Sequence, residues 1–175
     1  MHSPLPTFVP QKVCLACDGC CRFKEETSIF RPKVAEEEKK KLASYRSGLA
    51  QKIFSKTPWD NHGFIKAVKS QGICHCHFFN PQDNTCRVYP YRPWECQLYP
   101  FLLTKQGSSL VICVHLACPY VQEYYQTDKF KDYAVQLENY FKEKDVLEFI
   151  RNNPSLTGDY SAYREELEQV FSLRI

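Results

Sequence analysis

The chain has 175 residues, and ten of them are cysteine. A chain of this length can bury a hydrophobic core without disulfides, and 43% hydrophobic with 25% charged residues excludes a disordered or fibrous protein. The net charge of +3 is too small to indicate a nucleic acid or a membrane surface as the partner, and no apolar stretch approaches the roughly 18 residues of a transmembrane helix.

The first ten residues contain three prolines and lack the basic-then-apolar pattern of a secretory signal. We therefore expect a cytoplasmic protein. Thiols are kept reduced in the cytoplasm, where clustered cysteines bind metal more often than they form disulfides.

The first part of the chain combines one long helix with short strands. Leu42, Tyr45, Leu49 and Ile53 recur at helical spacing and predict a helix from Pro32 to about Ser55. Alternating apolar and polar residues predict a strand from Phe64 to Val68. The stretch 80–100 has four prolines and no clear period, which predicts an irregular loop.

The second part begins with a predicted hairpin, in which Phe101–Thr104 pairs with Leu110–Val114 across a turn at 107–109. Two apolar stripes then predict helices that end near Pro154, and a last helix is predicted from about Ser161 to Ser172. The stripes comprise Phe130, Ala134, Leu137 and Phe141, followed by Val146, Leu147 and Ile150.

Together these elements predict an α+β fold, in which about four helices brace an irregular cysteine-rich metal-binding half with short antiparallel strands. We treat 1–175 as a single domain with a cysteine-cluster region at 13–120 and an acidic helical extension at 121–175. The extension is chemically distinct, because residues 123–175 carry 7 basic and 11 acidic side chains. It offers a docking surface for a protein partner.

The densest motif is Cys14-x-x-Cys17-x-x-Cys20-Cys21, which places three thiols at C-x-x-C spacing on one tight loop. Such thiolates can converge on one soft cation or cluster, whereas the adjacent Cys20 and Cys21 are expected to point apart. Cys118 precedes Pro119, as the fourth cysteine does in ferredoxin-type motifs, but here it lies far downstream. The other cysteines are Cys74, Cys76, Cys86, Cys96 and Cys113.

Three interpretations of these cysteines compete. The first is an iron–sulfur cluster, which the triple cysteine step and the surplus of thiols favour. The second is one or two structural zinc sites, for which Cys76, Cys86 and Cys96 would supply further ligands. The third is a set of buried cysteines and disulfides, which the size of the chain and its expected compartment disfavour.

The ordered motifs resemble a known bacterial family. Cys14-x2-Cys17-x2-Cys20-Cys21, Cys76, the run from Cys86 through Arg92-Pro93 to Cys96, and Cys118-Pro119 are similar to the YkgJ-like or CxxCxxCC proteins, which are zinc- or iron-chelating domains. The resemblance spans about Val13 to Tyr120, and a related cluster occurs in flagellin lysine-N-methylases. It implies eight metal ligands: Cys14, Cys17, Cys20, Cys21, Cys76, Cys86, Cys96 and Cys118. Cys74 and Cys113 lie outside the motif, and Tyr99 and Tyr120 depart from it.

Three arginines near the thiols, Arg22, Arg87 and Arg92, would donate N–H groups to sulfur, although Arg92 could instead pair with Glu95. Tyr99-Pro100-Phe101 is interpreted as a packed lid over the site. His75 and His77 alternate with Cys74 and Cys76, so in a strand the imidazoles and the thiols would occupy opposite faces.

No His-Glu-x-x-His motif, nucleophile elbow or phosphate loop is present, so the residues assign no catalytic group and leave open whether the chain is an enzyme. The sequence therefore predicts a metal-binding protein that holds an iron–sulfur cluster or zinc. Cluster-dependent methyl transfer to a protein lysine is implied only by the resemblance to the methylases.

Overall fold

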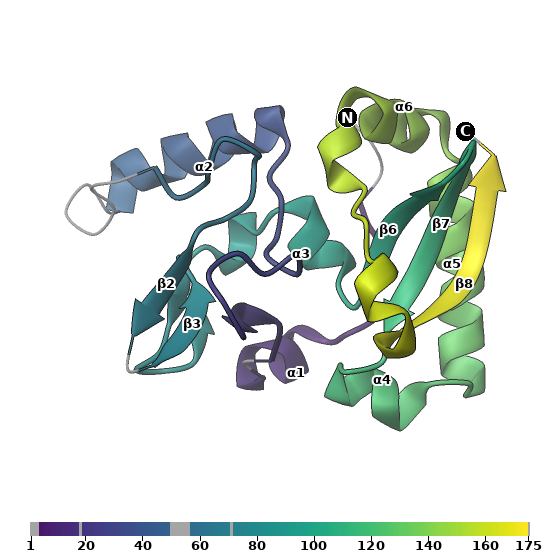
Figure 1. Ribbon diagram of the computed structural model, residues 1–175, viewed down its shortest axis with the longest axis horizontal. Coiled ribbons are helices and arrows are strands. Elements are labelled where there is room, and N and C mark those ends of the chain that lie inside the picture. The colour runs from purple at the N-terminus through teal and green to yellow at the C-terminus, as the bar shows by residue number, and fades with distance from the viewer. Residues whose placement is uncertain (1–3, 18, 50–56, 71, 175) are drawn as a thin grey trace. The chain divides into compact units, whose positions relative to one another are not determined.

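The computed structural model describes residues 4–17, 19–49, 57–70 and 72–174, without the side chains of 44–49. The chain divides into two compact units (Figure 1). We call residues 11–96 the cysteine unit, and residues 1–10 with 97–175 the hairpin unit. Helices combine with short antiparallel strands, which confirms the α+β class. The predicted boundary at 120/121 falls inside the hairpin unit, and the treatment of the chain as one domain stays a prediction.

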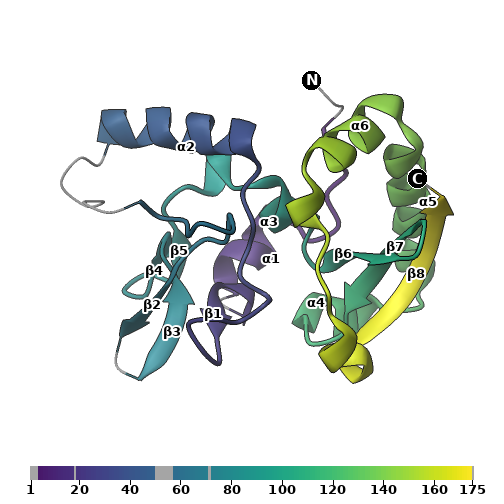
Figure 2. The same cartoon turned by 45° about the horizontal axis from the view of Figure 1, so that its top comes forward.

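The cysteine unit is built around the short strand β3, which is central in a three-stranded antiparallel sheet of order β1-β3-β2 (Figure 2). A two-stranded ladder, β4 with β5, follows. The elements in chain order are α1 (Gln11–Ala16), β1 (Arg22–Phe23), α2 (Glu36–Leu49), β2 (Ala67–Ser70), β3 (Ile73–Cys76), β4 (Phe79–Asn80), β5 (Thr85–Cys86) and α3 (Trp94–Leu98).

Apolar side chains from several segments of the cysteine unit form one core with residues of β3. Val34, Leu42, Ile65 and Phe78 are at most 2% exposed and form this core together with Cys76. The partly buried Cys21 and Cys86 pack against the same core. The core therefore fixes the backbone that carries these thiols.

The helix predicted from Pro32 begins at Glu36. The preceding residues stay extended, because Val34 N–H donates to the Gly63 carbonyl at 2.9 Å and Lys33 bridges Phe64. Glu38 then accepts the Ala35 N–H at 2.9 Å, which satisfies a donor at the helix start. The helix is described to Leu49, and residues 50–55 of the prediction lie outside the described residues.

Two further predictions for this unit were wrong in detail. The strand predicted at 64–68 lies at Ala67–Ser70, while Phe64 and Ile65 form only isolated bridges. The loop predicted at 80–100 contains β5 and α3. Its prolines are compatible with these elements because Pro93 directly precedes α3, where no N–H partner is required.

The hairpin unit contains a three-stranded antiparallel sheet of order β6-β7-β8 and three α-helices among its described residues. The predicted hairpin is confirmed, and its turn contains Gly107 at φ 59°, a backbone conformation that glycine adopts at little cost. The two predicted helices are confirmed as well, and Phe130, Leu137 and Phe141 are buried. The elements are β6 (Phe101–Gln106), β7 (Ser109–His115), α4 (Pro119–Tyr124), α5 (Asp128–Lys142), α6 (Lys144–Asn152) and β8 (Leu167–Arg174).

The helix predicted from Ser161 to Ser172 was wrong. Residues Ser161–Glu166 form a 3₁₀ helix, and Leu167–Arg174 form the strand β8 along β7. The register shifts at Ile112/Cys113, so that Ile112 pairs with Phe171 while Cys113 pairs with Gln169. This β-bulge leaves Val170 as an extra residue, and an extra residue breaks the two-residue alternation of a strand. The apolar spacing therefore resembled that of a helix.

No helix among the described residues is both long enough and apolar enough to cross a membrane. The cytoplasmic location stays a prediction.

Replacing Phe101 by alanine should lower the free energy of unfolding of the hairpin unit by about 3–5 kcal/mol. Phe101 is 0% exposed, and its ring lies within 5.9 Å of the rings of Phe8, Phe130 and Tyr133, measured between centroids. Denaturant unfolding followed by circular dichroism measures the loss. Val135→Ala is the control because Val135 is 58% exposed, and it should change stability by about 0.5 kcal/mol or less. Equal losses in the two variants would contradict this assignment of the core.

Candidate metal centre

Helix α1 and the turn after it carry the first four cysteines of the motif. Cys14 lies in α1, and the Cys14 carbonyl accepts the Cys17 N–H at 3.2 Å. The Gly19 N–H donates to the Cys17 sulfur at 3.4 Å, and Gly19–Cys21 form a 3₁₀ turn. The backbone thus turns tightly around the Cys17 thiol.

The prediction that Cys20 and Cys21 point apart was wrong. The two side chains are hydrogen-bonded to each other, and this bond together with burial raises the pKa of Cys20 well above its usual value. Opposed side chains are a property of extended strands, whereas these two residues lie in a 3₁₀ turn.

Three further thiols reach the same region from separate elements: Cys76 from β3, Cys86 from β5 and Cys96 from α3. Cys96 interacts electrostatically with Cys76, Cys86 and Cys20, and Cys86 also interacts with Cys14. The cysteine unit therefore gathers seven of the eight family cysteines, which we call the thiol cluster. Its members are Cys14, Cys17, Cys20, Cys21, Cys76, Cys86 and Cys96.

Burial holds these thiols in the neutral form. The pKa of Cys76 is raised to about 12, mainly by burial and in part by the neighbouring Cys86 and Cys20. Burial also raises the pKa of Cys96 well above its usual value, and the neighbouring Cys76 and Cys86 contribute to this increase. A thiolate in this cluster needs a nearby cation, because each new negative charge opposes the next.

All ten cysteines are free thiols, so the disulfide interpretation is not supported. Within the described part of the chain, no three His, Cys, Asp or Glu side chains are already arranged as metal ligands. The thiols of the cluster are thus close enough to shift one another's pKa values but do not converge on a point. Neutral thiols gain nothing by converging, whereas thiolates around a cation do.

Of the three predicted arginine donors, Arg92 is confirmed: its Nη1 donates to the Cys14 sulfur at 3.7 Å. The Arg92 guanidinium carbon also lies 4.3 Å from the centroid of the Tyr89 ring. Arg22 and Arg87 donate to the side chains of Asn84 and Asn80, at 3.3 Å and 3.1 Å. For these two arginines, a bond to sulfur stays a prediction.

Glu95 is buried and bonded to Lys33. Its carboxylate accepts the Lys33 N–H at 2.5 Å and lies 4.0 Å from Lys33 Nζ. Burial raises the pKa of Glu95 to about 7 although Lys33 opposes the shift, and burial lowers the pKa of Lys33. The neighbouring Trp94 N–H donates to Glu38 at 2.6 Å, so both carboxylates anchor α3 and with it Cys96.

Several predicted residues lie elsewhere. Cys118 is buried at the start of α4 in the hairpin unit, and its role as the eighth ligand stays a prediction. Cys74 is buried in β3, and Cys113 lies in β7. His75 lies between Cys74 and Cys76 in β3, and its Nδ1 lies 3.2 Å from the Cys76 carbonyl oxygen.

The lid interpretation does not hold for Phe101, whose ring packs in the aromatic core of the hairpin unit. The Tyr99 hydroxyl lies 3.1 Å from His115 Nδ1 in the same unit. Both side chains are therefore accounted for by contacts within the hairpin unit.

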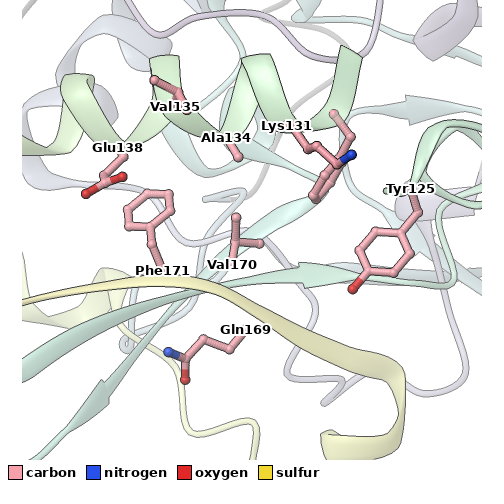
Figure 3. A pocket seen from close by; sticks show the side chains of 9 residues that line it. Tyr125, Lys131, Ala134, Val135, Glu138, Gln169, Val170 and Phe171 are labelled. Carbon is pink, nitrogen blue, oxygen red and sulfur yellow. The ribbon is translucent and has the colours of Figure 1, made fainter. Parts of the chain in front are cut away.

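A pocket of about 340 Å³ lies between α5 and β8 in the hairpin unit (Figure 3). No lining residue is cysteine or histidine, so the pocket does not belong to the thiol cluster. The apolar lining of the pocket includes Phe130, Ala134, Val135, Val170 and Phe171.

Docking of a protein partner on the acidic extension stays a prediction.

Sequence reasoning missed Tyr89 and the Lys33–Glu95 pair. The Tyr89 hydroxyl interacts with the Cys14 thiol, which lies 75 positions earlier in the numbering. No local pattern links residues so far apart. The one available signal was the position of Tyr89 between Cys86 and Arg92, both already assigned to the site.

Comparison with protein families gives a match over residues 13–119 to the model of the CxxCxxCC family, described as "Putative zinc- or iron-chelating domain". No curated protein and no solved structure matches the chain.

Glu95→Gln should remove a loss of stability that the unsubstituted protein shows as the pH rises from about 4.5 to 7. Because its folded pKa is raised above the usual 4.5, Glu95 favours folding at low pH, and this contribution disappears as the pH passes about 7. The shift corresponds to about 3 kcal/mol at most. Glutamine keeps an acceptor for the Lys33 N–H but does not ionise.

Urea unfolding followed by tryptophan fluorescence tests this, because Trp59 and Trp94 both lie in the cysteine unit. The control is Glu37→Gln, which removes an exposed carboxylate from α2. If Glu95→Gln and the unsubstituted protein keep parallel stability curves between pH 4.5 and 7, ionisation of Glu95 does not oppose folding.

Proposed function

The chain belongs to the CxxCxxCC family and is a metal-binding protein of the zinc- or iron-chelating type; from this and from the thiol cluster, we propose that its cysteines hold an iron–sulfur cluster. The proposed ligands are drawn from the seven thiols of the cysteine unit together with Cys118. A bound iron–sulfur cluster would supply one-electron chemistry or structural cross-linking.

The observation that carries this proposal is the gathering of seven free thiols in one unit of 86 residues, 11–96. Soft thiolate sulfur suits iron–sulfur clusters and zinc, and it does not suit magnesium or calcium. Burial raises the pKa of most of these thiols, so they are stable as thiolates only beside positive charge. The donor set therefore fits a thiolate-bound metal centre.

The number of thiols does not separate the two kinds of centre, because an iron–sulfur cluster and a tetrahedral zinc site both take four cysteines. The Arg92 N–H donates to a sulfur, and such donors set the reduction potential of a cluster in addition to balancing charge. Zinc has no redox chemistry that this donor could adjust, so the contact favours an iron–sulfur cluster.

Protein purified without oxygen should be brown, absorb broadly near about 400 nm, and contain iron and acid-labile sulfide. The measurement is an elemental determination of iron, zinc and sulfide on one preparation. A colourless protein with stoichiometric zinc would overturn the iron–sulfur proposal and leave structural zinc as the function of the thiols.

The pair Cys76→Ala and Cys74→Ala tests the ligand assignment within one strand. Both residues lie in β3 and are 6% and 5% exposed, but only Cys76 belongs to the thiol cluster. Cys76→Ala should lower the metal content and remove part of the folding free energy that metal binding supplies. Cys74→Ala should keep the metal. Equal metal content in both variants would exclude Cys76 as a ligand.

A further inference from the structure

One cysteine of the thiol cluster has polar neighbours of its own. Cys14 lies in α1 and is partly buried. Its sulfur accepts a hydrogen bond from Arg92 Nη1 at 3.7 Å, and the Tyr89 hydroxyl interacts with it as well. Two polar side chains therefore face this sulfur.

Arg92 is held in place by three local features. Its N–H donates to the Tyr89 carbonyl at 3.3 Å, and its backbone is extended, with φ −55° and ψ 141°, as expected before a proline. Its guanidinium stacks on the Tyr89 ring at 4.3 Å. From this position Nη1 reaches the Cys14 sulfur at 3.7 Å. A planar guanidinium can lie against an aromatic ring and still donate from the N–H groups at its edge.

Tyr89 is the second neighbour. Its hydroxyl is buried and has no partner at full hydrogen-bond geometry among the described residues, yet it interacts with the Cys14 thiol. A buried hydroxyl without a partner is costly, because it has lost water and gained nothing. A thiolate at Cys14 would give this hydroxyl an acceptor.

We propose that Tyr89 and Arg92 together form a two-donor shell on the Cys14 sulfur that stabilises the more reduced state of the bound metal centre. This inference rests on the proposed function. Tyr89 and Arg92 are positioning residues, because they act on the centre through Cys14. Hydrogen bonds to ligand sulfur offset the negative charge that reduction adds, so they raise the reduction potential.

The test measures the midpoint potential of the protein in two matched pairs of variants. Tyr89→Phe removes the buried hydroxyl, and Tyr91→Phe removes one from a residue of the same turn that is 50% exposed. Arg92→Lys keeps the charge but loses the stacking, and Arg151→Lys makes the same change at an exposed residue of α6 in the hairpin unit. Iron and sulfide content is determined for every variant.

At a fixed ambient potential, Tyr89→Phe and Arg92→Lys should each lower the ratio of reduced to oxidised centre about tenfold, which is about 59 mV for a one-electron couple. The two control variants should match the unsubstituted protein, and all variants should keep their iron and sulfide. Potentials for Tyr89→Phe and Arg92→Lys that equal those of the controls would overturn the inference and leave the proposed function intact.

If the unsubstituted protein holds zinc and no iron, the iron–sulfur proposal fails. Zinc affinity, determined by competition with a zinc chelator, is then measured in place of the midpoint potential. The two-donor shell then predicts that Tyr89→Phe and Arg92→Lys weaken zinc binding about tenfold or more, while Tyr91→Phe and Arg151→Lys do not. Equal zinc affinity in all four variants would overturn the inference.

Discussion

The cysteine unit depends on the cost of placing ionised sulfur where water is excluded. Burial is the largest cause of the raised pKa values of Cys76, Cys86 and Cys96, and each of these thiols would raise the others further if it ionised. Alone, the cluster is therefore a set of neutral thiols. A bound cation reverses this balance, because the repulsion among thiolates is then offset by attraction to a shared positive charge.

The helix that carries Cys96 is held in place by buried polar contacts. The Glu95 carboxylate accepts the Lys33 N–H, and the Glu38 carboxylate accepts the Trp94 N–H. These two hydrogen bonds join residues that are 62 and 56 positions apart in the sequence. These contacts connect the start of α2 to α3, the helix that carries Cys96. Because these carboxylates are buried and satisfied by N–H groups, they define one arrangement of the irregular backbone.

The spacing of apolar residues predicted those elements whose formation depends on neighbouring residues in the sequence. The β6–β7 hairpin follows from alternation around Gly107, and α5 follows from the stripe of Phe130, Leu137 and Phe141. The strand β8 could not be predicted in this way, because its bulge at Val170 depends on pairing with β7. The family motif predicted which thiols would gather, but the Lys33–Glu95 pair has no signal near either residue.

The contact between Cys20 and Cys21 suggests how one unit can hold more thiols than a metal ion needs. The two side chains are hydrogen-bonded to each other, and in such a pair one S–H donates while the other sulfur accepts. A thiol that stays protonated beside a thiolate adds no charge and satisfies a lone pair that would otherwise be buried without a partner. The Tyr89 hydroxyl and the Arg92 guanidinium are likewise hydrogen-bond donors to the Cys14 sulfur. Seven cysteines in one unit thus need not mean seven ligands, since a surplus thiol can stabilise a ligand as a hydrogen-bond donor.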